Sequence, residues 1–283
     1  MQPGPIIPNT TRGTDVPHPL IREVLAHNPA LTSKEWMPLQ GGRSNRLWRV
    51  GDWVVKLYDP AAASPLFPND PTEEAHALRR FGPVGLAPIL RAEGQGWLAY
   101  DHVAGRIWAE NPAPVAEALA RLHQLPVEGA GFRVLPSGSD ALAAQATRIA
   151  AACQGSLPFA PPSADVAPVQ HPCLIHGDAV AGNMIVGHAQ LTMIDWQCPA
   201  SGDATEDIAA FLSPAMQWLY RGTTLCTAEI ETFLAAYPDP HTVARYRRLA
   251  PAFHWRMAAH CLWKAERGAP DYATALRQEL AAL

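Results

Sequence analysis

Short apolar runs separated by polar turns fill the first hundred residues, a pattern that predicts β-strands. The predicted strands are 36–39, 47–50, 53–58, 89–92 and 96–100. Two other stretches carry apolar residues at the spacing of one helical face, which predicts helices at 18–27 and 70–81. The second of these begins at Asp70-Pro71, a capping residue followed by a first-turn proline.

Helical spacing dominates the rest of the chain, with one exception. The predicted helices are 114–124, 141–153, 203–218, 228–237, 243–264 and 272–283, with Pro251 as a candidate break in the fifth. The exception is a hairpin, in which apolar runs at 184–186 and 191–194 flank a polar turn that contains Gly187.

Composition narrows the classes of protein to which the chain can belong. Of its 283 residues, 48% are hydrophobic and 17% are charged, as in an ordinary globular protein. A net charge of −4 leaves no basic stripe for nucleic acid. We expect neither a signal peptide nor a membrane span, because the N-terminus lacks an apolar core and no apolar run reaches about 18 residues. The five scattered cysteines indicate a reduced, cytoplasmic protein. Residues 1–17 are expected to be loosely ordered.

Oxygen-bearing side chains gather around the hairpin. An apolar run leads into His176-Gly177-Asp178, Asn183 opens the first hairpin strand, and Asp195 follows the second. The hairpin is expected to bring Asn183 close to Asp195, with Asp178 just before them on the loop. Magnesium prefers carboxylate and amide oxygens, so Asn183 and Asp195 are candidate ligands. Asp178 is left to accept a proton from an attacking hydroxyl.

A second set of candidates lies among the first strands. The turn Gly41-Gly42-Arg43-Ser44-Asn45 offers small residues and backbone amides that suit phosphate oxygens, although a plain hairpin turn would look the same. Lys56 stands in an apolar strand, where it is either paired or at a solvent-facing edge. Glu73 and Glu74 begin the next helix, and either could be its partner.

These motifs resemble the aminoglycoside phosphotransferase and choline kinase-like family, whose members phosphorylate small molecules. His176-Gly177-Asp178 stands where protein kinases carry His-Arg-Asp, and Asp195-Trp196-Gln197 stands where they carry Asp-Phe-Gly. The resemblance covers most of residues 35–212. It implies an α+β, two-lobed protein-kinase-like fold. The N-lobe at 1–101 would have a small antiparallel sheet and bind the nucleotide, and the larger, mainly helical C-lobe at 102–283 would carry catalysis and substrate binding.

The resemblance also implies a role for each matched residue. Asp178 is the catalytic base and His176 orders its loop, while Asn183 and Asp195 hold magnesium. Lys56, positioned by Glu74, holds the α- and β-phosphates of ATP. Further nucleotide contacts are expected from the covering loop and the hinge, which comprise Gly41, Gly42, Ser44, Asn45, Tyr100, Asp101, His102 and Val103.

Several other polar and aromatic residues have two interpretations. His123 is expected to be structural, and Asp207 to brace the catalytic loop, while Asp203 either braces it or caps the following helix. Glu229, Glu231, Glu266 and Asp271 either attract a cationic acceptor or form a solvated helix face. Trp218, Trp255 and Trp263 form either a cation-binding wall or part of the core.

The predicted function is an ATP- and Mg²⁺-dependent transfer of the γ-phosphate to a hydroxyl of a small molecule, such as an aminoglycoside, choline or a sugar. No nucleic-acid or membrane partner is expected, and the sequence does not determine the acceptor, the nucleotide preference or the oligomeric state. A nucleotide-binding pseudokinase is the alternative, although Lys56, Asp178, Asn183 and Asp195 are all present. A protein kinase is disfavoured, because His-Arg-Asp, Asp-Phe-Gly and Ala-Pro-Glu are missing.

Overall fold

The computed structural model describes residues 15–39, 43–162 and 164–283. The described residues form two compact units, one within 1–106 and 185–198 and the other within 107–184 and 199–283. Most of the segment predicted to be loosely ordered lies outside the described residues, and so do Gly41 and Gly42. The division into lobes at residue 101 stays a prediction.

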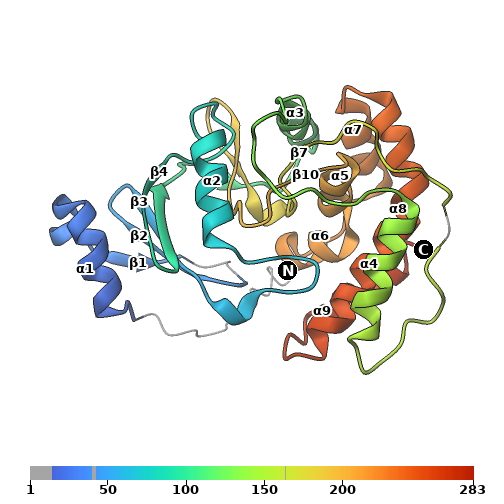
Figure 1. Cartoon of the computed structure of the whole chain (residues 1–283), viewed down its shortest axis with the longest axis horizontal. Helices are drawn as coiled ribbons and strands as arrows, with labels where there is room; N and C mark the ends of the chain where they lie inside the picture. The colour runs from blue at the N-terminus through green and yellow to red at the C-terminus, as the bar shows by residue number, and fades with distance from the viewer. Residues whose placement is uncertain (1–14, 40–42, 163) are drawn as a thin grey trace, which may run out of the picture. The chain divides into compact units, whose positions relative to one another are not determined.

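The first unit is built on a five-stranded antiparallel sheet, in the order β1-β2-β3-β5-β4 (Figure 1). Its strands are β1 (Trp36–Pro38), β2 (Arg46–Val50), β3 (Trp53–Leu57), β4 (Leu90–Gly94) and β5 (Trp97–Asp101). All five strands were predicted from the alternation of apolar runs and turns.

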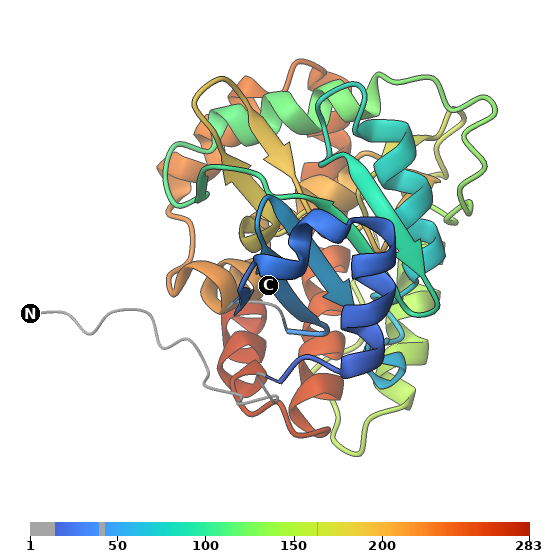
Figure 2. The same cartoon turned by 90° about the vertical axis from the view of Figure 1, so that its left-hand side faces the viewer.

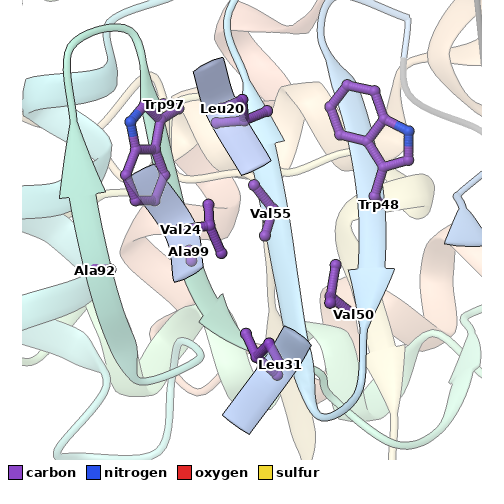
Figure 3. Close-up of a cluster of buried hydrophobic side chains, with 9 residues drawn as sticks. All are labelled: Leu20, Val24, Leu31, Trp48, Val50, Val55, Ala92, Trp97 and Ala99. Atoms are coloured by element: carbon purple, nitrogen blue, oxygen red, sulfur yellow. The ribbon is translucent and has the colours of Figure 1, made fainter. Parts of the chain in front are cut away.

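Two helical segments cover one face of this sheet. Figure 2 shows α1 (His18–His27) lying across the strands, and the short helix η1 (Pro29–Ser33) follows it. Leu20 and Val24 of α1 pack with Val55 of β3 in a buried cluster that also includes Trp48 and Trp97 (Figure 3). Because side chains alternate along a strand, the neighbour of Val55, Lys56, points to the opposite face.

The opposite face carries α2 (Pro71–Phe81), which contacts β4 and β5. Asp70 caps this helix, since its side chain accepts hydrogen bonds from the amides of Thr72 and Glu73. A short helix, η2 (Pro60–Ala62), lies in the connection between β3 and α2.

The predicted hairpin forms as β8 (Met184–Val186) and β9 (Leu191–Met193), in a three-stranded sheet with β6 (Arg106–Ile107).

The second unit is mainly helical. Its helices are α3 (Ala113–His123), α4 (Ser139–Ala151), η3 (Ala181–Asn183), α5 (Thr205–Leu212), α6 (Pro214–Arg221), α7 (Thr227–Ala236), α8 (Pro240–Ala265) and α9 (Tyr272–Leu280). The strands β7 (Cys173–Ile175) and β10 (Ala200–Gly202) pair in an antiparallel ribbon. Among the described residues, no helix has the length and hydrophobicity needed to span a bilayer.

One helix prediction in this unit was wrong at a proline, whereas the helix predicted over 243–264 is confirmed without its candidate break. The helix predicted over 203–218 is two helices, because Ser213 before Pro214 has an extended ψ of 120° and its side chain caps α6 through the amide of Met216. The candidate break at Pro251 is absent, and α8 runs through it. The helix α8 packs against α4, α5 and α9 (Figure 1). This packing offsets the loss of the one backbone hydrogen bond that proline cannot donate.

Candidate active site

Lys56 is the buried centre of a charged cluster in the first unit. The residue is 1% exposed, and its Nζ donates to Glu74 Oε2 at 2.5 Å and to Asp195 Oδ1. The choice between Glu73 and Glu74 is therefore resolved in favour of Glu74, which is fully buried on α2. The alternative of a solvent-facing lysine is wrong, because Lys56 is on the face of β3 that α2 covers.

The charges of this cluster keep Lys56 protonated. Burial alone would lower the pKa of Lys56, but the carboxylates of Asp195 and Glu74 outweigh it and hold the pKa above its ordinary value. Burial raises the pKa of Glu74, while the ammonium group of Lys56 opposes that rise. A protonated lysine next to a partly exposed carboxylate is suited to bind the phosphates of a metal–nucleotide complex.

Asp195 has a strained backbone. Its φ is 64°, in the left-handed region that residues other than glycine rarely adopt, and its side chain is 31% exposed. Such strain costs of order 1 kcal/mol or more and is concentrated at functional sites. Here it directs a carboxylate towards Lys56 while leaving part of that carboxylate accessible to a cation.

The predicted catalytic loop lies in the second unit and begins where β7 ends. Ile175 pairs with Ala200 of β10, and His176, Gly177 and Asp178 follow directly. Gly177 has a φ of 76°, so glycine permits the turn that places Asp178 after the buried His176. His176 Nδ1 accepts a hydrogen bond from the amide of Asp178 at 3.2 Å, and the ordering role of His176 in catalysis stays a prediction.

Asp207 braces this loop from α5. Its two carboxylate oxygens accept the amides of His176 and Gly177, both at 2.8 Å, and Oδ2 also lies 3.1 Å from His123 Nε2. Burial would raise the pKa of Asp207, but the bonds from His123 and His176 hold the pKa below its usual value. His123 is structural as predicted, because its Nδ1 is 2.8 Å from the hydroxyl of Tyr237.

The contacts of Asp203 are those of a residue at a helix start, and among the described residues its side chain makes no hydrogen bond to the loop at 176–178. Its Oδ1 accepts from the amide of Thr205 at the start of α5, and its Oδ2 accepts from Arg245 Nε at 2.7 Å. It therefore fixes the helix that carries Asp207.

Asp178 and Asn183 form one hydrogen-bonded unit. Asn183 Nδ2 donates to the backbone oxygen of Asp178 at 2.9 Å and lies 3.4 Å from Asp178 Oδ2. With Nδ2 engaged, Oδ1 is the atom of Asn183 that can bind a cation. Asp178 is 8% exposed, so its carboxylate sits at the edge of the buried loop.

The donor types at Asn183 and Asp195 fit magnesium, which takes amide and carboxylate oxygens together with water. Within the described part of the chain, no cluster of three or more His, Cys, Asp or Glu side chains is arranged for a metal. Asn183 belongs to the second unit and Asp195 to the first, so their joint binding of one ion stays a prediction.

The predicted hinge residues lie at the end of β5. Tyr100 is buried on the Lys56 face, and Asp101 is bound by Arg91 through Nε at 2.6 Å and Nη2 at 2.7 Å. The amides of Asp101 and His102 donate to the backbone oxygens of Ile89 and Asp52. A base that binds here would therefore have to use other backbone groups, such as those of Val103 in the following loop.

Of the covering loop, the structure describes Ser44 and Asn45. Ser44 is half-buried, whereas Asn45 is 7% exposed and its side-chain amide is bonded within the unit to Asn69 and Gln197. The predicted nucleotide contacts of both residues stay predictions.

Two residues at this cluster were not predicted. The hydroxyl of Tyr58 donates to Glu74 Oε2, and Gln197 Oε1 lies 3.4 Å from Lys56 Nζ. Tyr58 is two residues after Lys56, a spacing that places it on the same side of the chain, and this signal could have identified it. Gln197 follows Asp195 in an irregular segment, where no periodicity indicates which way a side chain points.

The acids suggested for a cationic acceptor are already engaged. Glu229 pairs with Arg221, Glu231 pairs with Arg247, and Glu266 accepts the amides of Gln154 and Gly155. Asp271 caps α9 at the amide of Tyr272. The acids are therefore neither available for a cationic acceptor nor simply solvated, because each one pairs with a nearby arginine or accepts backbone amides.

Of the two interpretations given to the three tryptophans, the core holds for Trp255, so the three do not form one cation-binding wall. Trp255 is 4% exposed and donates to the backbone oxygen of Phe159 at 2.9 Å. The ring of Trp263 carries the guanidinium of Arg267, 4.4 Å from its centroid. Only Trp218 of the three is exposed.

Comparison with known proteins gives the chain a family context. The model of the phosphotransferase enzyme family matches residues 35–249. A choline/ethanolamine kinase family protein from Mesorhizobium loti is similar in structure, with 17% identity, coverage of 93% of this chain and 92% of that one, and a TM-score of 0.66. No curated protein matches the chain in sequence.

Two aminoglycoside phosphotransferases are also similar in structure. The GDP complex of aminoglycoside 2'-phosphotransferase-IIIa has 15% identity, with coverage of 93% and 98% and a TM-score of 0.66. The streptomycin–ATP complex of APH(2")-IIa has 13% identity, with coverage of 94% and 97% and a TM-score of 0.64. The predicted α+β, protein-kinase-like fold is thereby confirmed.

Proposed function

Because the chain belongs to the phosphotransferase enzyme family, we propose that it transfers the γ-phosphate of ATP to a hydroxyl group of a small molecule. The observation that carries the proposal is Lys56, a buried, protonated lysine that bonds both Glu74 and Asp195. The structural relatives support it, because their descriptions name a choline/ethanolamine kinase family and aminoglycoside phosphotransferases, one of them with ATP bound.

Each unit would supply a part of the reaction. In the first unit, Lys56 would bind the α- and β-phosphates, and Asp195 would be a ligand of magnesium, with Asn183 of the second unit as another. Bound magnesium would neutralise charge on the phosphates. Asp178 would orient the acceptor hydroxyl and take its proton as the oxygen forms a bond to the γ-phosphorus and the bond to the β-phosphate oxygen breaks.

The catalytic loop is organised for this proton transfer. His176 and Gly177 donate their amides to Asp207, so the backbone before Asp178 is fixed at two points. Asn183 donates to the backbone oxygen of Asp178 and fixes the residue itself. A base held in one place reduces the reorganisation needed in the transition state.

The test is the release of ADP from magnesium ATP across a panel of amino alcohols, aminoglycosides and sugars. We expect release that depends on one class of acceptor and falls by a factor of about 10²–10⁴ in Asp178→Asn, which removes the base. Asp140→Asn is the matched control, because Asp140 is an exposed acid at the start of α4 in the same unit.

The outcomes separate the proposal from its alternatives. Equal release in wild type and Asp178→Asn would exclude Asp178 as the base. Tight ATP binding without release for any acceptor would favour a nucleotide-binding pseudokinase. Phosphate found on a protein in place of a small molecule would favour a protein kinase.

A further inference from the structure

Three buried or half-buried side-chain amides meet next to Lys56, and we name Asn45, Asn69 and Gln197 the amide cluster. Asn45 Nδ2 donates to Asn69 Oδ1 at 2.8 Å and to Gln197 Oε1 at 3.1 Å. Asn69 Nδ2 donates back to Asn45 Oδ1 at 3.0 Å. Gln197 Oε1 therefore lies between two donors, Asn45 Nδ2 and, 3.4 Å away, Lys56 Nζ.

The amide cluster links three segments that carry the proposed nucleotide machinery. Asn45 precedes β2, Asn69 precedes the cap of α2, and Gln197 is two residues after Asp195. The backbone of Asp59 adds a fourth connection, since its amide donates to Asn45 Oδ1 at 3.0 Å and its oxygen accepts from Asn69 Nδ2 at 2.8 Å. A displacement of any one segment must therefore break hydrogen bonds in the others.

The chemistry of the amides suits a site that already holds two carboxylates. Lys56 bonds Glu74 and Asp195, so a third carboxylate would be repelled by both and by the phosphates of a nucleotide. An amide oxygen offers Lys56 another acceptor without adding negative charge. Gln197 is 4% exposed. Its Oε1 also accepts a hydrogen bond from Asn45 Nδ2, and this second bond fixes the position of the oxygen.

We infer that Gln197, held by Asn45, is a positioning residue that sets the place of the Lys56 ammonium group for binding of the nucleotide's phosphates. This inference rests on the proposed function, because it requires a nucleotide at Lys56. It also assigns Asn45 to a role through Gln197 in place of the direct nucleotide contact that the sequence predicted.

The experiment measures the dissociation constant of magnesium ADP by calorimetry and the melting temperature of the same samples. Gln197→Met keeps the length of the side chain and removes its oxygen, and we expect ADP binding to weaken about tenfold. Gln190→Met is the matched control. The side-chain amide of Gln190 donates one hydrogen bond of 3.0 Å to the backbone oxygen of Gly85, at an exposed position of the same unit. We expect it to bind ADP as the wild type does.

A cycle of variants tests whether the amide cluster acts as one unit. Asn45→Ala is expected to weaken ADP binding severalfold in the wild type and to have almost no further effect in Gln197→Met. A role in folding alone would lower the melting temperature without changing the dissociation constant. If Gln197→Met does not fold, Asn69→Ala replaces it, since Asn69 is half-buried and acts on Asn45.

Three results would overturn the inference. Wild-type affinity in Gln197→Met, or in Asn69→Ala when that variant replaces it, would show that the amide cluster does not position Lys56. If the fold-change in the dissociation constant of the double variant equals the product of the two single fold-changes, Asn45 acts independently of Gln197. Absence of ADP binding to the wild type would overturn the proposed function together with the inference.

Discussion

At the scale of single residues, Glu74 holds its position through an oxygen shared by two donors. Lys56 Nζ and the hydroxyl of Tyr58 both donate to Glu74 Oε2, and Lys56 Nζ lies 4.9 Å from the centroid of the Tyr58 ring. Burial is the first cause that raises the pKa of Tyr58, and the negative charge of Glu74 adds to it. The phenol therefore stays protonated and remains a donor across the physiological pH range.

Tyr58→Phe removes this donor and leaves the aromatic packing in place. A hydrogen bond to a charged group contributes about 1.5–3 kcal/mol, so we expect the free energy of unfolding to fall by about that amount. Chemical denaturation measures it. Tyr246→Phe is the control, because Tyr246 is buried on α8 and its hydroxyl makes no hydrogen bond to any residue in the described part of the chain. An equal loss in both variants would show that the Tyr58 hydroxyl contributes nothing specific.

Residue identities at the site could be predicted where chemistry alone restricts them. A lysine inside an apolar strand needs a counter-charge, and this need led to Lys56 and the pair of glutamates after it. Residue chemistry alone could not choose between Glu73 and Glu74, because the choice depends on the rotation of α2 about its axis. The family resemblance selected Glu74, which is the residue that bonds Lys56. Gln197 could not be predicted at all, since its partners Asn45 and Lys56 are far away in sequence.

At the scale of elements, two helices begin in the same way and permit a matched comparison. Asp70-Pro71 opens α2 and Asp239-Pro240 opens α8, and each aspartate accepts two backbone amides of its first turn. The cap satisfies amides that have no partner inside the helix. The two helices differ in one respect, because α2 contains Glu74, the partner of Lys56, and α8 contains no residue of that cluster.

Replacement of these caps should separate stability from nucleotide binding. Asp70→Ala and Asp239→Ala are each expected to lower the free energy of unfolding by about 0.5–2 kcal/mol. We expect only Asp70→Ala to weaken magnesium ADP binding also, because fraying of α2 releases Glu74. Calorimetric titration of both variants checks this, and equal ADP affinities would contradict the link between the cap and Lys56.

Two prolines show what the sequence can and cannot settle about helix ends, since Pro214 separates two helices and Pro251 lies inside one. At Ser213-Pro214 the proline and the capping serine were both visible, but the apolar spacing continued across them and favoured one helix. At Pro251 the local signal favoured a break. The contacts of α8 with α4, α5 and α9 keep the helix continuous, and these partners come from distant parts of the sequence.

At the scale of the whole molecule, buried ionisable groups decide how stability depends on pH. His260 of α8 is 1% exposed and packs against the rings of Trp263 and Tyr272. Burial lowers its pKa to about 3, and the positive charges of Lys264 and Arg256 act in the same direction. The folded protein therefore keeps His260 neutral at a pH where the unfolded chain binds a proton.

The sign of the effect follows from linkage. Above a pH of about 6.5 both states are neutral at this residue and stability does not change. Below it the unfolded state gains a proton that the folded state does not bind, so stability falls by up to about 1.4 kcal/mol for each pH unit, until the folded state also protonates. Carboxylates titrate mainly below pH ~5, which leaves the interval from pH 6.5 to 5 for histidines.

His260→Gln removes this titration, and we expect the variant to lose about 1.5–2 kcal/mol less than the wild type between pH 6.5 and 5. Urea denaturation at each pH measures the free energy of unfolding. The comparison uses the slope of this free energy against pH, so it holds even if the variant is less stable at every pH. His171→Gln serves as the control, because His171 is exposed in the same unit and should keep the wild-type slope. Equal slopes in wild type and His260→Gln would show that His260 takes up a proton in the folded state over this pH interval.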